Sequence, residues 1–192
     1  MNRKNFFDLL KNRMGVGELN YIQIAYWLAK EAHRLQRRDT GERYFEHCRQ
    51  VALILVKEKG IFDYRVIVSA LLHDVLEDSF VPPEVLLAIF GAEIYEWLQF
   101  LSKSVPVRDL VHGKISLRAK KSTDEYFAGI RNGPHPLRMV KLADRIHNFR
   151  SFGCWRRARK KKYVTETKKY LLPIALETDA GFAAEIRKFI HK

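Results

Sequence analysis

The sequence has few cysteines and no long apolar run, and both absences narrow the class of protein. Cys48 and Cys154 are the two cysteines among 192 residues, and they form neither a CxxC pair nor a disulfide framework. A reducing, cytoplasmic compartment is therefore expected. The longest apolar run, from Val51 to Val56, covers six residues, whereas a membrane-spanning helix needs about 20. Because Asp8 and Lys11 interrupt the apolar stretch near the N-terminus, we do not expect a signal peptide. With no apolar run of sufficient length, a membrane that the chain would span is not expected as a partner either.

Glycine loops of the phosphate-binding kind are also missing. The sequence has neither a GxxxxGK[ST] nor a GxGxxG pattern, so any phosphate would be bound by a metal ion and basic side chains. Acidic residues are in deficit: 35 Lys and Arg against 22 Asp and Glu give a formal charge of +13. Such an excess favours a polyanionic partner, which could be nucleic acid, an anionic membrane or a highly phosphorylated small molecule.

What the sequence does contain is helical periodicity over almost its whole length. With 47% apolar residues it can build a core, and apolar positions recur at spacings of three and four while no alternating strand pattern stands out. This predicts an all-α fold in one domain spanning 1–192. The expected helices cover 19–35, 43–58, 64–77, 83–90, 94–101, 124–130 and 137–152, one ends near 176, and a C-terminal helix lies within 179–192.

Local signals define the helix ends. Gly60 is a plausible C-terminal glycine, Asp63 and Ser122 are expected N-caps, and Pro82 and Pro83 suit a first helical turn. Residues 104–122 break any long pattern, so we interpret them as a long surface loop or a partly ordered segment. A strongly basic stretch occupies 156–169.

Metal-ligand chemistry is concentrated in three places. They are His47, the segment from His73-Asp74 to Glu77-Asp78, and Asp144. Buried carboxylates are costly unless a cation or hydrogen bonds offset them, and mixed histidine and carboxylate ligands suit Mn²⁺, Fe²⁺, Zn²⁺ or Co²⁺. Taken singly, an inward histidine is more often a hydrogen-bonded core group. The joint pattern on separate helices is much harder to obtain by chance.

These residues form part of longer motifs. They are Arg38-x-Thr40-Gly41-Glu42-x-Tyr44-x-x-His47, Ala70-Leu71-Leu72-His73-Asp74-Val75-x-Glu77-Asp78, Phe90-Gly91 and Val140-Lys141-Leu142-Ala143-Asp144-Arg145-Ile146-His147-Asn148-x-Arg150-Ser151. Through them the chain resembles the HD-domain metal-dependent phosphohydrolases and, more closely, the hydrolase domain of the RelA/SpoT family. The likeness covers about residues 18–178.

The resemblance implies a single HD-domain helical bundle and an activity. That family's hydrolase domain removes the 3′-diphosphate of guanosine tetraphosphate and pentaphosphate, the alarmones of the stringent response, and releases pyrophosphate with GDP or GTP. The expected enzyme is a stand-alone, Mn²⁺-dependent guanosine-3′,5′-bis(diphosphate) 3′-pyrophosphohydrolase whose partner is a small nucleotide substrate.

It also implies roles for individual residues. One Mn²⁺ would be held by His47, His73, Asp74 and Asp144. Glu77 and Asp78 match the acidic pair that positions or deprotonates the attacking water. The substrate side is assigned to Arg38, Thr40, Asn148, Ser151 and Lys141. We expect Arg145 to be a structural ion-pair partner, and His147 either to support the metal ligands from behind or to be structural.

Three questions stay open at the level of sequence. Asp39 and Arg43 stand where the family usually has a basic residue and proline, and Asp39 beside a base pocket could change which purine is preferred. Adenosine alarmones are therefore an alternative substrate for the same site, and the resemblance to the family's animal members adds NADPH. The stretch 156–169 could instead bind nucleic acid, but its aromatic residues are sparse and no nucleic-acid motif is present, which argues against that function. The oligomeric state is not indicated.

Overall fold

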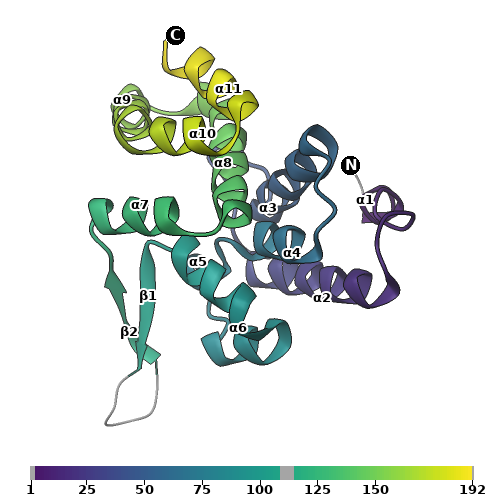
Figure 1. Ribbon diagram of the computed structural model, residues 1–192. Helices are drawn as coiled ribbons and strands as arrows, with labels where there is room; N and C mark the ends of the chain where they lie inside the picture. The colour runs from purple at the N-terminus through teal and green to yellow at the C-terminus, as the bar shows by residue number, and fades with distance from the viewer. Residues whose placement is uncertain (1–2, 109–114, 192) are drawn as a thin grey trace.

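The protein is all-α over most of its length, as predicted, with one β-hairpin attached (Figure 1). The structure is a computed structural model that describes residues 3–108 and 115–191. Its first half contains α1 (Arg3–Asp8), α2 (Val16–Ala32), α3 (Tyr44–Leu53) with a π-helical turn over Ile54–Glu58, α4 (Tyr64–Leu72), α5 (Val75–Asp78) and α6 (Pro83–Leu101). After the hairpin of β1 (Ser104–Arg108) and β2 (Ile115–Lys120) come α7 (Thr123–Asn132), α8 (His135–Arg150), a 3₁₀ turn over Phe152–Cys154, α9 (Arg157–Glu166), a π-helical turn over Thr167–Leu171, α10 (Leu172–Thr178) and α11 (Ala180–Ile190).

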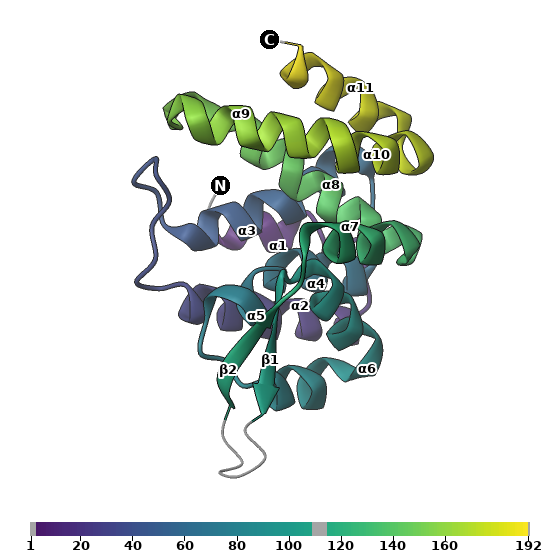
Figure 2. The same ribbon diagram turned by 90° about the vertical axis from the view of Figure 1, so that its left-hand side faces the viewer.

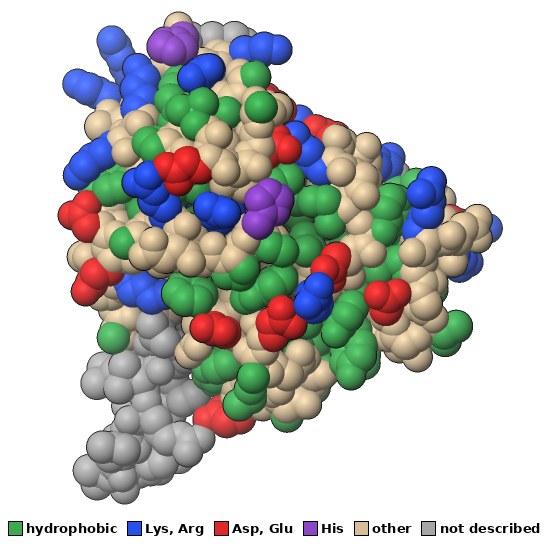
Figure 3. All heavy atoms as spheres, in the orientation of Figure 1, with side chains coloured by type: hydrophobic (Ala, Val, Ile, Leu, Met, Phe, Trp, Pro, Cys, Tyr) green, Lys and Arg blue, Asp and Glu red, His purple; other side chains and the backbone are tan. Residues whose placement is uncertain are grey.

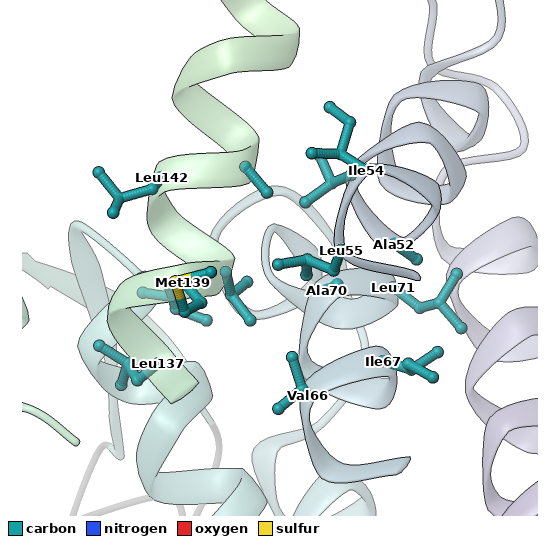
Figure 4. Close-up of a cluster of buried hydrophobic side chains, with 14 of the residues drawn as sticks. Ala52, Ile54, Leu55, Val66, Ile67, Ala70, Leu71, Leu137, Met139 and Leu142 are labelled. Atoms are coloured by element: carbon teal, nitrogen blue, oxygen red, sulfur yellow. The ribbon is translucent and has the colours of Figure 1, made fainter. Parts of the chain in front are cut away.

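Helix α4 lies at the centre of the bundle because it has almost no polar face. Every residue from Val66 to Leu72 is buried, and a helix that is apolar all round must be surrounded by other elements. Helices α2, α3, α6 and α8 pack against it. Figure 4 shows side chains of α4, α8 and the end of α3 meeting in one apolar cluster. The C-terminal end of α4 is thereby held in a fixed position.

Several helix ends follow the predicted signals. The Asp63 carboxylate accepts a hydrogen bond from the backbone N–H of Arg65 at 2.9 Å, and Ser122 forms a capping box with Glu125. The two helices expected on either side of Phe90-Gly91 are confirmed: α6 consists of two helical segments joined at a kink, where the backbone of Gly91 is not helical. The φ of Gly91 is +80°, in the region that favours glycine.

The single helix predicted for 64–77 is wrong in its second half. Helix α4 ends at Leu72, and the short helix α5 begins only at Val75. His73 and Asp74 therefore form a junction between two helices. No proline or glycine marks this break in the sequence, so the apolar periodicity alone could not reveal it.

The loop predicted for 104–122 is also wrong for the residues that form strands. β1 and β2 pair antiparallel, with Ser104 opposite Lys120 and Val107 opposite Leu117. Residues 109–114 of the predicted loop lie outside the described part of the chain. Pro106 within the first strand weakens the strand signal, and a two-stranded hairpin has edges where a proline is tolerated.

The C-terminal helices lie over the end of α8. In Figure 2, α9 crosses above α3 and α8, and an ion pair of 2.8 Å between Arg145 of α8 and Glu166 of α9 connects the two helices. Helices α10 and α11 both pack on α8. Among the described helices, none combines the length and apolar character needed to cross a bilayer.

Candidate metal centre

Four predicted ligands converge from three places in the chain. His47 comes from α3, His73 and Asp74 from the junction of α4 and α5, and Asp144 from α8. The His47 Nε2 atom lies 3.2 Å from Asp144 Oδ1 and 3.2 Å from His73 Nε2. Asp74 Oδ2 lies 3.0 Å from His73 Nε2 and 3.7 Å from His47 Nε2. His47, His73 and Asp144 thus form one group whose ligand atoms all lie within 4.8 Å of one another, whereas Asp74 lies beside this group and is not part of it.

The cluster is buried, and its charges depend on one another. His47, His73 and Asp144 are at most 5% exposed. Although burial opposes both shifts, the Asp74 carboxylate raises the pKa of His73 to about 9, and the Lys141 ammonium holds the pKa of Asp144 well below its usual range. Burial lowers the pKa of His47. In the metal-free protein, a proton on His73 therefore partly offsets the two carboxylates.

Hydrogen bonds orient the ligands. Asp144 accepts from Asn148 Nδ2 at its Oδ1 atom and from Lys141 Nζ at its Oδ2 atom, each at 2.7 Å. Tyr44 donates its hydroxyl proton to Asp74 Oδ2 at 2.7 Å. His73 Nδ1 lies 2.8 Å from the carbonyl oxygen of Ala70, which fixes its proton at Nδ1 and leaves Nε2 free to bind a metal.

This donor set fits a divalent metal ion. Nε2 of His47, Nε2 of His73 and a carboxylate oxygen of Asp144 all lie within 4.8 Å of one another. Two imidazoles and two carboxylates suit a first-row divalent ion better than Ca²⁺, which prefers an all-oxygen shell. A cation would also offset the charge of the buried Asp144 carboxylate in this largely dry site.

A polar cleft of about 360 Å³ opens onto the cluster and contains the predicted acidic pair. The Glu77 carboxylate accepts a hydrogen bond from the Lys103 backbone N–H at 2.8 Å. Lys103 follows the C-terminal end of α6, so this bond fixes Glu77 relative to that helix. Loss of hydration in the cleft, together with the charges of Asp74 and Glu77, raises the pKa of Asp78 to about 6. Asp78 can therefore exchange a proton near neutral pH.

The residues predicted to bind substrate are partly brought together. Arg38, Thr40, Lys141 and Asn148 line the cleft. Arg38 donates to Asn148 Oδ1 at 2.7 Å and to Ser151 Oγ at 3.1 Å. Ser151 therefore supports Arg38, and Asn148 connects Arg38 with Asp144. Lys141 directs its ammonium to Asp144, so its clearest contact is with a metal ligand.

Other cleft residues were not predicted from the sequence. They are Leu101, Lys103, Tyr126, Trp155, Arg159 and Tyr163 among others, whereas Asp39, which also lines the cleft, was expected near the base. Arg159 pairs with Asp39 and lies 3.9 Å from the Trp155 ring centroid. The basic stretch 156–169 is evident in the sequence, but no sequence feature distinguishes Arg159 from the other basic residues in it. Lys103 lies just before the predicted loop of 104–122, and no sequence pattern distinguishes it. Arg145, 1% exposed, is the structural ion-pair partner of Glu166 that was expected.

A helical bundle with a histidine, a His-Asp pair and a further aspartate at a common site is typical of HD-domain metal-binding proteins. Here these residues are His47, His73-Asp74 and Asp144. Residues 25–177 match the family model described as the HD domain, so the chain belongs to the HD-domain family. The bifunctional (p)ppGpp synthase/hydrolase SpoT of Escherichia coli (strain K12) is 30% identical over 172 residues, which are 88% of this chain and 23% of that protein. This homology confirms the resemblance to the RelA/SpoT-type HD domain.

Two further comparisons agree with this placement. The guanosine-3′,5′-bis(diphosphate) 3′-pyrophosphohydrolase of Aquifex aeolicus (strain VF5) is 33% identical over 155 residues, 80% of this chain and 21% of that protein. The chain thus spans less than a quarter of the length of these relatives. A solved structure of a metazoan ortholog of SpoT that hydrolyses ppGpp superposes with a TM-score of 0.73 at 23% identity, covering 89% of this chain and 94% of that one. That likeness establishes the fold.

Proposed function

We propose that this chain is a guanosine-3′,5′-bis(diphosphate) 3′-pyrophosphohydrolase that uses Mn²⁺. It converts guanosine tetraphosphate or pentaphosphate and water into pyrophosphate and GDP or GTP. The observation that carries the proposal is the acidic pair Glu77 and Asp78 beside the ligand cluster, in one cleft. The names of the relatives that match 80% to 88% of the chain support the choice of substrate.

The cleft carries cations suited to a phosphorylated ligand. Lys103 and Lys141 both line it, and loss of hydration together with the Lys141 charge lowers the pKa of Lys103. The Lys103 ammonium, whose charge the Lys141 charge disfavours, is stabilised when an anion enters the cleft beside it. A diphosphate group bound next to the metal ligands would be such an anion.

The chemistry follows from the placement of the residues. A divalent ion held by His47, His73, Asp74 and Asp144 would lower the pKa of water and neutralise phosphate charge. Glu77, fixed by the Lys103 N–H, orients the attacking water, and a carboxylate oxygen of Asp78 accepts its proton. The water oxygen forms a bond to the phosphorus on the ribose 3′-oxygen, and the bond between that phosphorus and the 3′-oxygen breaks. The 3′-oxygen takes up a proton, and pyrophosphate leaves.

We also propose a cytoplasmic location. Cys48 is buried and Cys154 is exposed, and neither forms a disulfide. Free thiols are typical of a reducing compartment.

A substrate panel with Mn²⁺ tests the proposal. We expect pyrophosphate release from guanosine tetraphosphate, and slower turnover of its adenosine analogue and of NADPH. Release of no pyrophosphate from either alarmone would contradict the main proposal. Turnover of NADPH alone would assign the site to a different nucleotide.

Substitution of Glu77 tests its role separately from the metal. Glu77→Gln should lower kcat by about 10²- to 10⁴-fold while the affinity for Mn²⁺ stays the same, because the side chain acts on water and not on the ion. Glu96→Gln, an exposed change of the same chemistry on α6, serves as the control. Loss of Mn²⁺ binding in the Glu77 variant would show that Glu77 is a ligand instead.

A further inference from the structure

His147 lies directly behind the metal ligand His47. Their Nδ1 atoms are 2.7 Å apart, and their ring centroids are 4.8 Å apart. His147 stands three residues after Asp144 on α8. One helix therefore provides both a metal ligand and the neighbour of another ligand.

The two nitrogens of His47 face different surroundings. Nε2 points to the cluster, 3.2 Å from Asp144 Oδ1, whereas Nδ1 points to His147. A neutral imidazole that gives its Nε2 lone pair to a cation must hold its proton on Nδ1. That N–H is buried and needs an acceptor. Nδ1 of His147 is placed to be this acceptor, with the His147 proton on its own Nε2.

The Nδ1–H of the other histidine ligand, His73, also needs a hydrogen-bond acceptor, but a backbone group provides it. His73 directs its Nδ1 to the backbone carbonyl of Ala70 at 2.8 Å, a contact that side-chain substitution does not remove. For His47 the corresponding acceptor is the side chain of His147. Its tautomer is therefore open to change by mutation.

We propose that His147 is a positioning residue that fixes the metal-binding tautomer of His47 by accepting the His47 Nδ1–H. The inference rests on the metal centre of the proposed function but not on any particular substrate. It gives His147 a defined partner and a measurable role in metal affinity, where the sequence indicates a residue that either supports the metal ligands or is structural.

His147 can also be reached from outside the catalytic cleft. It lines a second cavity of about 520 Å³, together with Glu42, Arg49, Lys57 and others, whereas His47 lines the cleft. If the His147 side chain is truncated, a small molecule in this cavity can take its place. Free imidazole has the required acceptor nitrogen.

The test measures Mn²⁺ affinity on the full chain without substrate. His147→Phe keeps a ring but removes the acceptor, and we expect its affinity to fall about 10- to 100-fold, as for other residues that orient a ligand. His147→Gln offers an amide oxygen and should recover most of the loss. His147→Ala should lose affinity and regain it when imidazole is added. His135→Ala, an exposed histidine on the same helix, should bind Mn²⁺ like the native chain.

A spectroscopic readout isolates the tautomer. Histidine ¹⁵N spectra of the Zn²⁺-loaded native chain should show a protonated Nδ1 on His47, and in His147→Phe this signal should broaden or disappear. Mn²⁺ affinity in His147→Phe equal to that of the native chain would overturn the proposal, as would no recovery in either His147→Gln or imidazole-treated His147→Ala. A chain that shows the expected affinities yet releases no pyrophosphate would retract the proposed function alone.

Discussion

Asp144 is the residue on which both charge balance and metal binding depend. It points one oxygen to His47 and Asn148 and the other to the buried Lys141 ammonium. Asp144→Asn should abolish Mn²⁺ binding and activity. In the metal-free chain it should also lower the free energy of unfolding by about 3 kcal/mol, because it leaves a buried cation without its partner. Urea unfolding in the presence of a chelator measures this effect.

A second substitution separates the two consequences. Lys141→Met in the Asp144→Asn background removes the unpaired ammonium and should recover most of the lost stability. Metal binding should stay absent. If the double variant unfolds as easily as the single one, the Lys141 charge is not the cause.

The proton on His73 predicts how metal binding depends on pH. The Asp74 carboxylate raises the pKa of His73 to about 9 in the metal-free chain, so an incoming ion must displace that proton at neutral pH. The affinity for Mn²⁺ should therefore rise by about tenfold per unit between about pH 6 and 8. Calorimetry in two buffers of different ionisation enthalpy should detect about one released proton. An affinity that does not change over this range would contradict the prediction.

The same proton sets the sign of the stability change in the metal-free chain. Because the folded pKa of His73 lies above its ordinary value of 6.5, the ion pair with Asp74 stabilises the fold fully at acidic pH. That contribution is lost as the pH rises through about 9. In the metal-loaded chain, the interaction of Asp74 with the metal ion would take the place of this ion pair.

At the scale of elements, the hairpin fixes the catalytic cleft from one side. The backbone N–H of Lys103, at the start of the hairpin, binds Glu77, while Lys121 at its end donates to the carbonyl oxygens of Gln99 and Ser102 at 2.6 and 3.1 Å. These contacts join α5, the end of α6 and both strands. The residue that binds Glu77 therefore directly precedes the segment predicted as a loop, and Lys121 within that segment ties the hairpin to the end of α6.

The bend in α6 depends on one glycine. Gly91 has φ +80° and ψ 173° inside the helix, a conformation that costs a residue with a Cβ about 1–3 kcal/mol. Gly91→Ala should therefore destabilise the chain by this amount while Mn²⁺ affinity stays unchanged. Thermal and urea unfolding measure the effect. An added Cβ at this position meets no atom within 4 Å, so steric overlap cannot account for the loss.

Gly17 provides the opposite case in another helix. It lies in the first turn of α2 without a positive φ, and an added Cβ again has open space around it. Gly17→Ala should stabilise the chain by about 0.5 kcal/mol, since it restricts the unfolded chain more than the folded one. Equal effects of the two substitutions would exclude backbone conformation as the cause.

Elements set by apolar periodicity and capping could be predicted, whereas features decided by distant contacts could not. The helix beginning after Asp63 follows from local signals. The break at His73-Asp74 and the hairpin containing Pro106 do not. The same division holds in the site: the ligands lie in recognisable motifs, but the bond from Lys103 to Glu77 spans 26 residues and has no local signature.

At the scale of the molecule, the formal charge of +13 is unevenly distributed. Residues 156–169 hold eight Lys and Arg but only Glu166 as an acid. In Figure 3, blue side chains project at the upper left, where Figure 1 places α9. Arg159 and Tyr163 of α9 line the cleft, so the basic helix borders the acidic metal centre. This arrangement suits attraction of a highly phosphorylated nucleotide from a distance.

Nucleic-acid binding by the same surface would have a different signature. A gel shift whose affinity falls steeply with salt would indicate several phosphate contacts along a strand. Aromatic residues suited to stacking are few here: Trp155 is buried, and Tyr163 is only partly exposed. We therefore expect weak binding to RNA or DNA.

Electrostatic attraction of the substrate gives the last prediction. If α9 steers the nucleotide, kcat/KM for guanosine tetraphosphate should decrease as salt rises, since screening shortens the range of attraction to about 3 Å at 1 M. Replacing the exposed Lys161 and Lys162 with Gln should lower kcat/KM at low salt by up to about tenfold, and the difference should vanish at high salt. Replacing Arg187 and Lys188 of α11, which removes the same charge away from the cleft, should have a smaller effect. Equal losses in both pairs would mean that net charge, and not the position of α9, attracts the substrate.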